Sequence, residues 1–201
     1  KYFSQKSQIT VKDLLSHVSG LPAFKQYYKT DKNKESLLTS IYNTDPVQNN
    51  RDTTIYSDVG AIILGDIVEK ISGLNLDVFV DSMVFKPLGM NTTFYNPPGT
   101  KKHRIVPTEI NSEGELIHGF VHDENAYSLG GVAGHAGLFS TAKDLAVFSQ
   151  MMLNGGLYGW KRIFKTATIN SFTSKAGILE SSSRLLGWDS PAGLASGGVY
   201  L

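Results

Sequence analysis

Residues 55–73, IYSDVGAIILGDIVEKISG, decide the fold class of this 201-residue chain. Apolar residues recur at helical spacing through residues 59–72, and Gly73 supplies a common helix stop. The sequence therefore predicts a buried central helix over residues 59–72. Tyr56 and Asp58 stand two positions apart just before it, and residues i and i+2 of an extended segment point the same way. We expect this phenol and this short acidic side chain to face one cleft.

Periodicity and capping residues predict further helices on both sides of the central one. Thr10 and Asp13 form a capping box at the start of the first of them, and Pro87 is expected to break the helix that follows Gly73. The expected ranges are residues 11–19, 34–42, 76–85 and 142–153. Residues 104–122 are expected to form a hairpin, or a pair of short extended segments, around the sequence NSEG. The sequence thus predicts a mainly helical structure with a small β component.

Composition excludes several classes of function. The chain has 19 basic and 18 acidic residues and no long run of like charge, which argues against nucleic-acid and membrane-surface partners. Without cysteine there is no disulfide framework, thiolate metal site or cysteine nucleophile. No apolar run reaches the roughly 20 residues that cross a bilayer. Glycines cluster in residues 130–137 and 155–159, where we expect turns and close backbone approaches.

Three stretches together carry a resemblance to a known family. They are residues 55–73, residues 9–22 (ITVKDLLSHVSGLP) and residues 130–156 (GGVAGHAGLFSTAKDLAVFSQMMLNGG). Over roughly residues 8–175 the chain resembles the serine β-lactamase and penicillin-binding-protein-like hydrolases, which include esterases and D-amino-acid peptidases. The resemblance implies an α+β fold of the β-lactamase/transpeptidase type. Residues 1–201 would be a single partial domain that covers mainly the helical subdomain, with few strands.

The resemblance also implies a mechanism. In this family a serine in an SxxK motif attacks an ester or amide, and the lysine one turn later activates it. That motif belongs upstream of the visible stretches, and the third motif, Lys or His followed by Thr or Ser and Gly, belongs near or beyond Leu201. The chain thus resembles an internal fragment with one catalytic motif of three, and we expect it to be inactive alone. D-Alanyl cell-wall peptides, small esters and β-lactams are all candidate substrates, no cofactor is needed, and an extracytoplasmic location is typical of the family.

Tyr56 and Asp58 are the candidate catalytic residues of this fragment. The family phenol that matches Tyr56 assists proton transfer, whereas the simpler alternative is a buried aromatic ring. Asp58 stands where the family usually has asparagine, and an ionised carboxylate can only accept hydrogen bonds. An aspartate before a helix can equally be an ordinary N-cap, so both roles stay open for Asp58.

Two other short motifs imitate catalytic ones. Ser140 to Lys143 is an SxxK at the start of a helix, which we interpret as a cap and helix start. His135 to Gly137 imitates the third motif but lies in a glycine-rich loop, so we interpret it as a loop bordering the cleft and His135 as a candidate substrate-binding residue. We expect the Tyr56 hydroxyl to point into a groove shared with this loop.

The histidines also invite other chemistries. His118 and His122 are four apart, but Gly119 and the β-forming residues after it argue against the helix that would aim both imidazoles at one metal. A serine–histidine triad is a minor alternative, because no GxSxG elbow occurs. The sequence therefore predicts no metal site.

The second hypothesis is that the chain is a binding or structural protein and not part of an enzyme. In a degenerate binding or structural relative, Asp58 and the missing SxxK would be native features. The flanking coding sequence distinguishes the two hypotheses. If the chain is a fragment, exposed apolar surface is expected to favour self-association.

Overall fold

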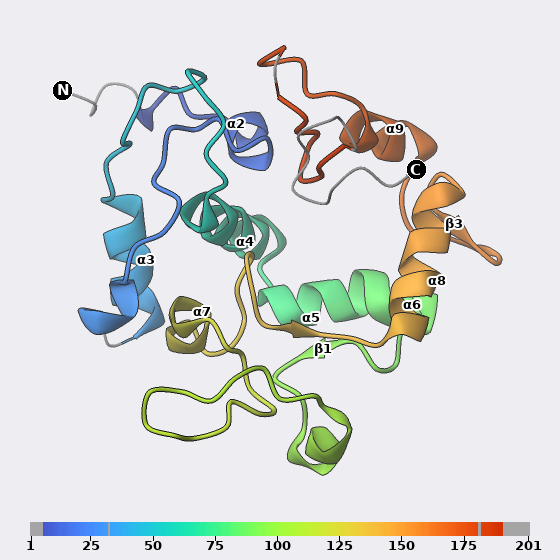
Figure 1. Ribbon diagram of the computed structural model, residues 1–201. Coiled ribbons are helices and arrows are strands. Elements are labelled where there is room, and N and C mark those ends of the chain that lie inside the picture. Colours follow the sequence, from blue (N-terminus) through green and yellow to red (C-terminus); the bar gives the residue numbers. More distant parts are fainter. Residues whose placement is uncertain (1–5, 32, 181, 191–201) are drawn as a thin grey trace.

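The computed structural model describes residues 6–31, 33–180 and 182–190 (Figure 1). Helices dominate these ranges, and the strands within them form two antiparallel pairs, β1 with β2 and β3 with β4. This confirms the predicted mainly helical structure. The described elements are, in chain order, α2 (Val11–Leu15), η1 (Tyr27–Lys29), α3 (Lys34–Tyr42), α4 (Asp58–Ser72), α5 (Leu76–Val80), η2 (Asp81–Phe85), α6 (Lys86–Leu88), β1 (Phe94–Tyr95), η3 (Gly99–Arg104), α7 (Glu124–Ser128), β2 (Leu138–Phe139), α8 (Ala142–Leu153), β3 (Leu157–Tyr158), β4 (Lys161–Arg162) and α9 (Thr166–Thr173).

Helix α4 lies at the centre of the molecule, as the sequence predicts (Figure 1). Gly73 ends it in the left-handed conformation, at φ 71°. Buried side chains from α2, α3 and the α7 region pack against it and form the first core. The principal members of this core are Leu14, Leu21, Tyr27, Leu37, Ile41, Val59, Ile62, Val121, Ala126 and Leu129. Because several elements cover α4, it needs apolar residues on more than one side.

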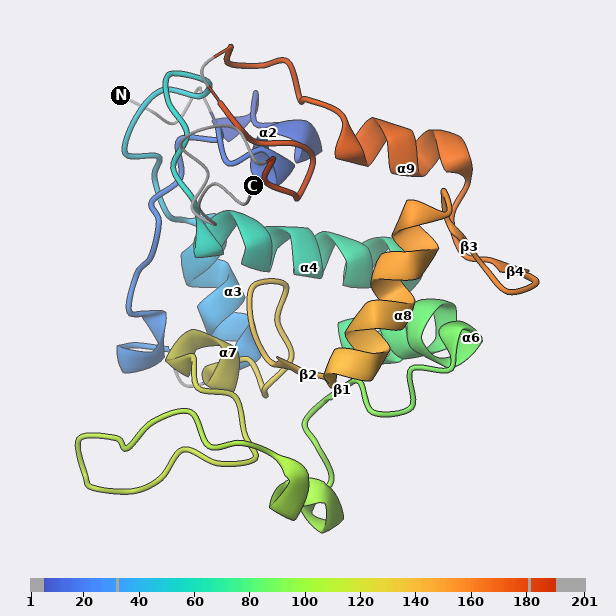
Figure 2. The same cartoon turned by 45° about the vertical axis from the view of Figure 1, so that its right-hand side comes forward.

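A second core joins α6 to α8. Met151 of α8 is fully buried against Phe85, Leu88 and Met90. The hairpin of β3 and β4 extends beyond this core, and α9 follows it (Figure 2). Helix α8 covers residues 142–153 as predicted, with Thr141 as its N-cap.

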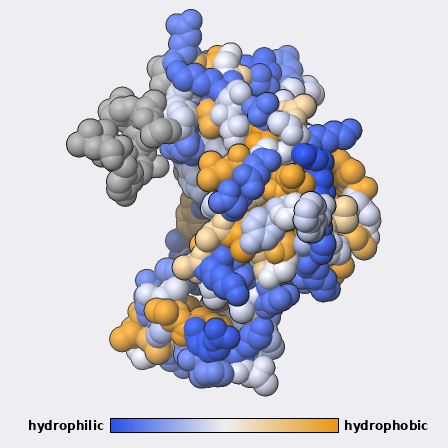
Figure 3. Space-filling view, turned by 90° about the vertical axis from the view of Figure 1, so that its right-hand side faces the viewer, coloured by the Kyte–Doolittle hydropathy of each residue, from blue (hydrophilic) through white to orange (hydrophobic). Residues whose placement is uncertain are grey.

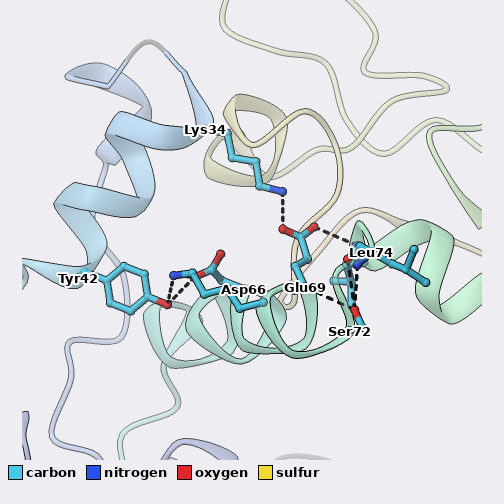
Figure 4. Close-up of polar contacts among 8 residues, drawn as sticks. Lys34, Tyr42, Asp66, Glu69, Ser72 and Leu74 are labelled. Atoms are coloured by element: carbon cyan, nitrogen blue, oxygen red, sulfur yellow. Dashed lines mark hydrogen bonds and ion pairs between the residues drawn. The ribbon is translucent and has the colours of Figure 1, made fainter.

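Polar side chains of α3 and α4 contact one another (Figure 4). Tyr42 donates its hydroxyl proton to the Asp66 carboxylate, and Lys70 pairs with the same carboxylate at 2.6 Å. Burial and the Asp66 carboxylate raise the pKa of the Tyr42 phenol. One turn further on, Lys34 lies 2.7 Å from Glu69. The two helices are therefore held together by charge-assisted hydrogen bonds as well as by the apolar core.

The first helix is shorter than predicted. It starts at Val11 with the expected capping box of Thr10 and Asp13, but it ends at Leu15 and not at residue 19. His17 adopts φ 57°, which turns the chain out of the helix, and the Val18 N–H bonds back to the Asp13 carbonyl at 2.9 Å. A non-glycine residue in this conformation gives no clear signal in the sequence.

The prediction that Pro87 breaks its helix is wrong. The helical path continues from α5 through η2, a π-helical turn, into α6, and Gly89 ends it at φ 72°. Pro87 lies in the first turn of α6, where a missing N–H is tolerated. The widened turn before it shifts the hydrogen bonds by one residue, so that the Lys86 N–H bonds to the Asp81 carbonyl.

Residues 104–122 form an extended loop that projects from the body (Figure 2). Ile110 and Leu116 form an isolated antiparallel bridge around NSEG, and Asn111 donates its N–H to the Glu115 carbonyl at 2.8 Å. The pair of short extended segments is thus confirmed, whereas a regular hairpin of strands does not form. Among the described residues, no helix combines the length and apolarity that crossing a membrane requires.

The Asp13 carboxylate lies fully buried at the start of α2. Burial alone would raise its pKa, but hydrogen bonds from Arg51, Thr10 and Asn50 lower it to about 2. The Arg51 guanidinium approaches within 2.8 Å. Because the folded pKa lies below the unfolded value of about 3.9, this carboxylate stabilises the protein fully above pH ~4 and loses its contribution as the pH falls toward 2.

We expect Asp13→Asn to make unfolding less dependent on pH between about pH 2 and 4. The native carboxylate should account for a change of about 2 kcal/mol across this window. Urea titrations of both proteins at several pH values measure the difference. Identical slopes for the two proteins would contradict the burial and pairing described for Asp13.

Candidate active site

The segment before α4 is fixed by its neighbours on both sides. The Ser57 hydroxyl accepts a hydrogen bond from the Gly60 N–H at 3.0 Å and donates one to the Pro22 carbonyl at 2.7 Å. The Asp58 N–H bonds to the Ala23 carbonyl at 2.9 Å. Ser57 is therefore the N-cap, and Asp58 is the first helical residue. The alternative in which Asp58 caps the helix is wrong, because the serine hydroxyl already holds that position.

Tyr56 lies immediately before α4, on the surface. Its side chain is 57% exposed, so the buried-ring alternative is excluded. The ring packs against the His17 imidazole with a centroid distance of 4.6 Å, and the Arg184 guanidinium lies 5.3 Å from the ring centroid. Among residues 6–31, 33–180 and 182–190, none forms a hydrogen bond with the Tyr56 hydroxyl. The phenol is thus held by its ring, and its oxygen is free to bond elsewhere.

His17 was not connected with Tyr56 by sequence reasoning. Its Nδ1 accepts the Ser57 N–H at 3.1 Å, so the proton of the neutral ring is on Nε2. Burial and the nearby Arg184 charge lower the pKa of His17 to about 4, although the Asp189 carboxylate opposes this shift. The left-handed backbone of His17 aims the ring at the segment before α4. The chain distance between His17, Tyr56 and Arg184 explains why no local pattern revealed them.

We expect protonation of His17 to destabilise the fold. Because its folded pKa lies below the unfolded value of about 6.5, the neutral ring contributes fully above pH ~6.5, and stability falls as the pH drops toward 4. The loss is at most about 3 kcal/mol, and solvent screening at this partly exposed ring reduces it. His17→Asn tolerates the left-handed backbone and keeps an acceptor for Ser57. Urea titrations should show a flatter stability profile from pH 4 to 6.5 in this variant, whereas an unchanged profile would contradict the prediction.

Asp58 belongs to a second group of side chains, with His135 and Asp123. Burial raises the pKa of the Asp58 carboxyl, the His135 charge lowers it, and the Asp123 carboxylate raises it. Asp58 is therefore more easily protonated than a surface aspartate, and its protonated form can donate a hydrogen bond.

His135 ties its glycine-rich loop to α7. Its Nε2 lies 2.8 Å from the Asp123 carboxylate, and Asp123 also caps α7 by accepting the Ala126 N–H. Burial would raise the pKa of Asp123, but these hydrogen bonds hold it below its usual range. The His135 side chain is only 2% exposed, and its Nδ1 has no hydrogen-bond partner among the residues that the structure describes. The imidazole thus supports the loop from inside, and its role in substrate binding stays a prediction.

The groove that the sequence predicts between Tyr56 and the His135 loop stays a prediction. A cavity of about 560 Å³ borders the loop through Ala136, Gly137 and Leu138, but Tyr56, Asp58 and His135 do not line it. Tyr56 instead lies on open surface beside Arg184. Further along α4, the loop packs directly against the helix, because Gly134 lies close to Ala61 and Gly65.

The SxxK of residues 140–143 serves local structure. The Thr141 hydroxyl caps α8 by accepting the Asp144 N–H, and the Ser140 hydroxyl lies 2.8 Å from the Thr93 hydroxyl. Asp144 is buried and accepts hydrogen bonds from both Thr92 and Thr93. Ser140 and Thr141 thus take part in the start of α8, which agrees with their interpretation as a cap and helix start.

The histidines considered for metal binding make separate contacts. His118 Nε2 bonds to the carbonyls of Lys102 and Ile105, and His122 lies 3.3 Å from Glu109. In the part of the chain that the structure describes, no group of three or more potential ligand side chains is placed to hold a metal ion.

Comparisons with known proteins agree on one family. The family model described as Beta-lactamase matches residues 1–194. A protein of Salmonella gallinarum named "Putative D-alanyl-D-alanine carboxypeptidase" is 39% identical over 205 residues, which cover 91% of this chain and 47% of that protein. The chain therefore spans about half the length of the curated relatives it matches.

Solved structures share the fold at lower identity. A penicillin binding protein from Bacillus halodurans aligns with a TM-score of 0.67 and 17% identity, over 97% of this chain and 62% of that one. FmtA from Staphylococcus aureus aligns with a TM-score of 0.69 and 16% identity, over 93% of this chain and 50% of that one. With the central helix, the Tyr56 segment and the match over nearly the whole sequence, the chain belongs to the Beta-lactamase family of serine hydrolases and penicillin-binding-protein-like enzymes.

Proposed function

We propose that this chain is the central part of one serine hydrolase domain that cleaves ester or amide substrates through an acyl-serine intermediate. The observation that carries the proposal is Tyr56, a phenol that is held by its ring at the start of α4 and whose hydroxyl forms no hydrogen bond with the described residues. Such a hydroxyl can pass a proton between a serine nucleophile and the leaving group. Membership of the family supports the rest of the proposed mechanism.

Asp58 would assist Tyr56. As a carboxylate it accepts a hydrogen bond from the ammonium group of the SxxK lysine. Its raised pKa also makes the protonated form accessible, and that form can donate a hydrogen bond as the asparagine of related enzymes does. His135 would contribute to substrate binding indirectly, by fixing the loop of residues 130–137 on α7.

D-Alanyl peptides of the cell wall are the favoured substrate class, because the Salmonella relative carries the name of a D-alanyl-D-alanine carboxypeptidase. The intact protein should release D-alanine from diacetyl-lysyl-D-alanyl-D-alanine and also react with penicillin. Parallel assays with p-nitrophenyl acetate distinguish a peptidase from an esterase. Failure to turn over or become acylated by any of these compounds would overturn the proposal.

The chain of 201 residues should be inactive when it is expressed alone. Ser140 belongs to its single SxxK sequence, and the hydroxyl of this serine is bonded to Thr93 beside the cap of α8. Removing the nucleophile from an acyl-transfer enzyme costs several orders of magnitude in rate, on the order of 10⁶ in a well-studied protease.

A non-catalytic relative is the second candidate, and the acidic residue at position 58 favours it. A strictly ionised Asp58 repels carbonyl oxygens instead of donating to them. Such a protein would bind D-alanyl peptides reversibly and form no covalent adduct. An SxxK upstream and a Lys- or His-Thr-Gly downstream in the coding sequence would support the enzyme, and their absence would support the binding protein.

We also propose that the chain self-associates when it is expressed alone. Several large apolar side chains are more than 80% exposed, namely Ile71, Val106, Leu153 and Trp160. Sedimentation velocity should show association that increases with protein concentration and weakens in a Leu153→Ser, Trp160→Ser double variant. A monomer at every concentration would contradict this expectation.

A further inference from the structure

A cavity of about 560 Å³ is lined by residues of the strands β1 and β2 and of the projecting segment of residues 99–122. Its volume falls in the range of small-molecule sites, which is roughly 300–1,000 Å³. Phe94 of β1 pairs directly with Phe139 of β2, so the two rings stand on the same face of the pair and form one wall. The apolar lining residues include Phe94, Ile105, Val106, Phe120, Leu138 and Phe139.

Basic side chains lie at the same cavity. The Lys101 ammonium lies 4.7 Å from the centroid of the Phe94 ring, so its charge is held beside the apolar wall. Arg104 is exposed, and within the described ranges its guanidinium has no ion pair or hydrogen bond. His122 adds a third basic group, although it faces Glu109 at 3.3 Å.

The acidic side chain at the cavity already has a hydrogen-bond partner. Asp123 is the acidic residue among the described lining residues, and its carboxylate bonds to His135 at 2.8 Å. Lys101 and Arg104 therefore outnumber the acidic lining residue, next to aromatic and aliphatic surface. The segment of residues 99–122 forms the lowest part of the molecule in Figure 1. Figure 3 shows hydrophobic and hydrophilic residues side by side on this part.

Hydrogen bonds hold the backbone around Arg104, on the basic side of the cavity, without any ligand. His118 Nε2 donates to the carbonyls of Lys102 at 2.9 Å and Ile105 at 2.8 Å, which fixes the end of η3. The Lys102 side chain packs over Gly119, where a Cβ would come within 3.2 Å of it. Because Arg104 lies between the two bonded carbonyls, its backbone is positioned in advance, which reduces the entropic cost of binding.

We propose that this cavity binds a small organic anion, a carboxylate carried on an aromatic or branched apolar body. The apolar walls would bury the body, and Arg104 and Lys101 would pair with the carboxylate. Inorganic anions lack the body, and neutral apolar compounds leave the cations unpaired. Tyr56 and Asp58 do not line the cavity, whereas Asp123, which belongs to the same group of side chains as Asp58, does.

Fluorescent pyrene derivatives test this site on the purified protein. Pyrenebutyrate has the carboxylate and the aromatic body, and pyrenebutanol has the same body without the charge. Anisotropy titrations should show 1:1 binding of pyrenebutyrate that is about tenfold tighter than binding of pyrenebutanol, with no competition from millimolar inorganic phosphate. Equal affinities for the acid and the alcohol, or no binding of the acid, would overturn the proposal.

Variants locate the binding. Arg104→Glu should weaken pyrenebutyrate binding about tenfold while leaving pyrenebutanol binding unchanged. Lys175→Glu makes the same charge change at an exposed residue outside the cavity and should have no effect. Leu138→Ala should weaken both probes, and Tyr56→Phe should affect neither. Equal losses in the Arg104 and Lys175 variants would reveal general charge attraction and would overturn the assignment of the site.

Discussion

Tyr56→Phe should lower the kcat of the intact enzyme by about 10² to 10⁴ while KM changes little. The substitution removes one oxygen and keeps the ring that packs against His17 and Arg184. Since no described residue bonds to that oxygen, folding should be unaffected, and the loss should be confined to proton transfer. Steady-state kinetics with a D-alanyl peptide and with p-nitrophenyl acetate measure it.

A matched control separates this effect from the loss of any tyrosine hydroxyl. Tyr28→Phe makes the same change in η1, away from the start of α4, and should leave kcat unchanged. Thermal melts should give the same midpoint for both variants and the parent. If Tyr56→Phe kept its activity within about twofold of the parent, Tyr56 would have no role in catalysis.

Gly134→Ala should destabilise the protein by about 3 kcal/mol. A Cβ at residue 134 would lie 2.1 Å from the Ala61 carbonyl oxygen and 3.0 Å from the Gly65 nitrogen, both in α4. A Cβ at Gly65 would in turn lie 2.9 Å from the Gly134 nitrogen. The loop and the helix thus touch backbone to backbone, and neither can move aside without breaking the central helix or the cap of α7.

Gly99→Ala is the control for this substitution. It adds the same methyl group at a glycine where nothing lies within 4 Å, so stability should change by less than about 0.5 kcal/mol. Urea titrations of both variants give the free energies of unfolding. Equal stabilities would contradict the close contact between the loop and α4.

Local sequence patterns predicted those elements whose conformation is determined by residues close to them in the sequence. The capping box at Thr10 and Asp13, the periodicity of α4 and its stop at Gly73 all lie within a few residues of the structures they specify. The glycine cluster of residues 130–137 was expected to mark close backbone approaches, and the contact of Gly134 with α4 confirms this. In these places sequence neighbours determine the conformation.

Features that depend on distant residues could not be predicted. Pro87 was expected to end a helix, but the π-helical turn of η2 carries the chain past it. The support of Tyr56 comes from His17 and Arg184, which no local pattern links to it.

The site of acylation tests the central claim most directly. The intact protein and the 201-residue chain are each treated with a fluorophosphonate and with penicillin, and the labelled peptide is identified by mass spectrometry. We expect one stoichiometric label on the intact protein, at the serine of an SxxK other than residues 140–143, and no label on the 201-residue chain. A stoichiometric label on Ser140, lost together with ester turnover in Ser140→Ala and Lys143→Ala, would contradict the account.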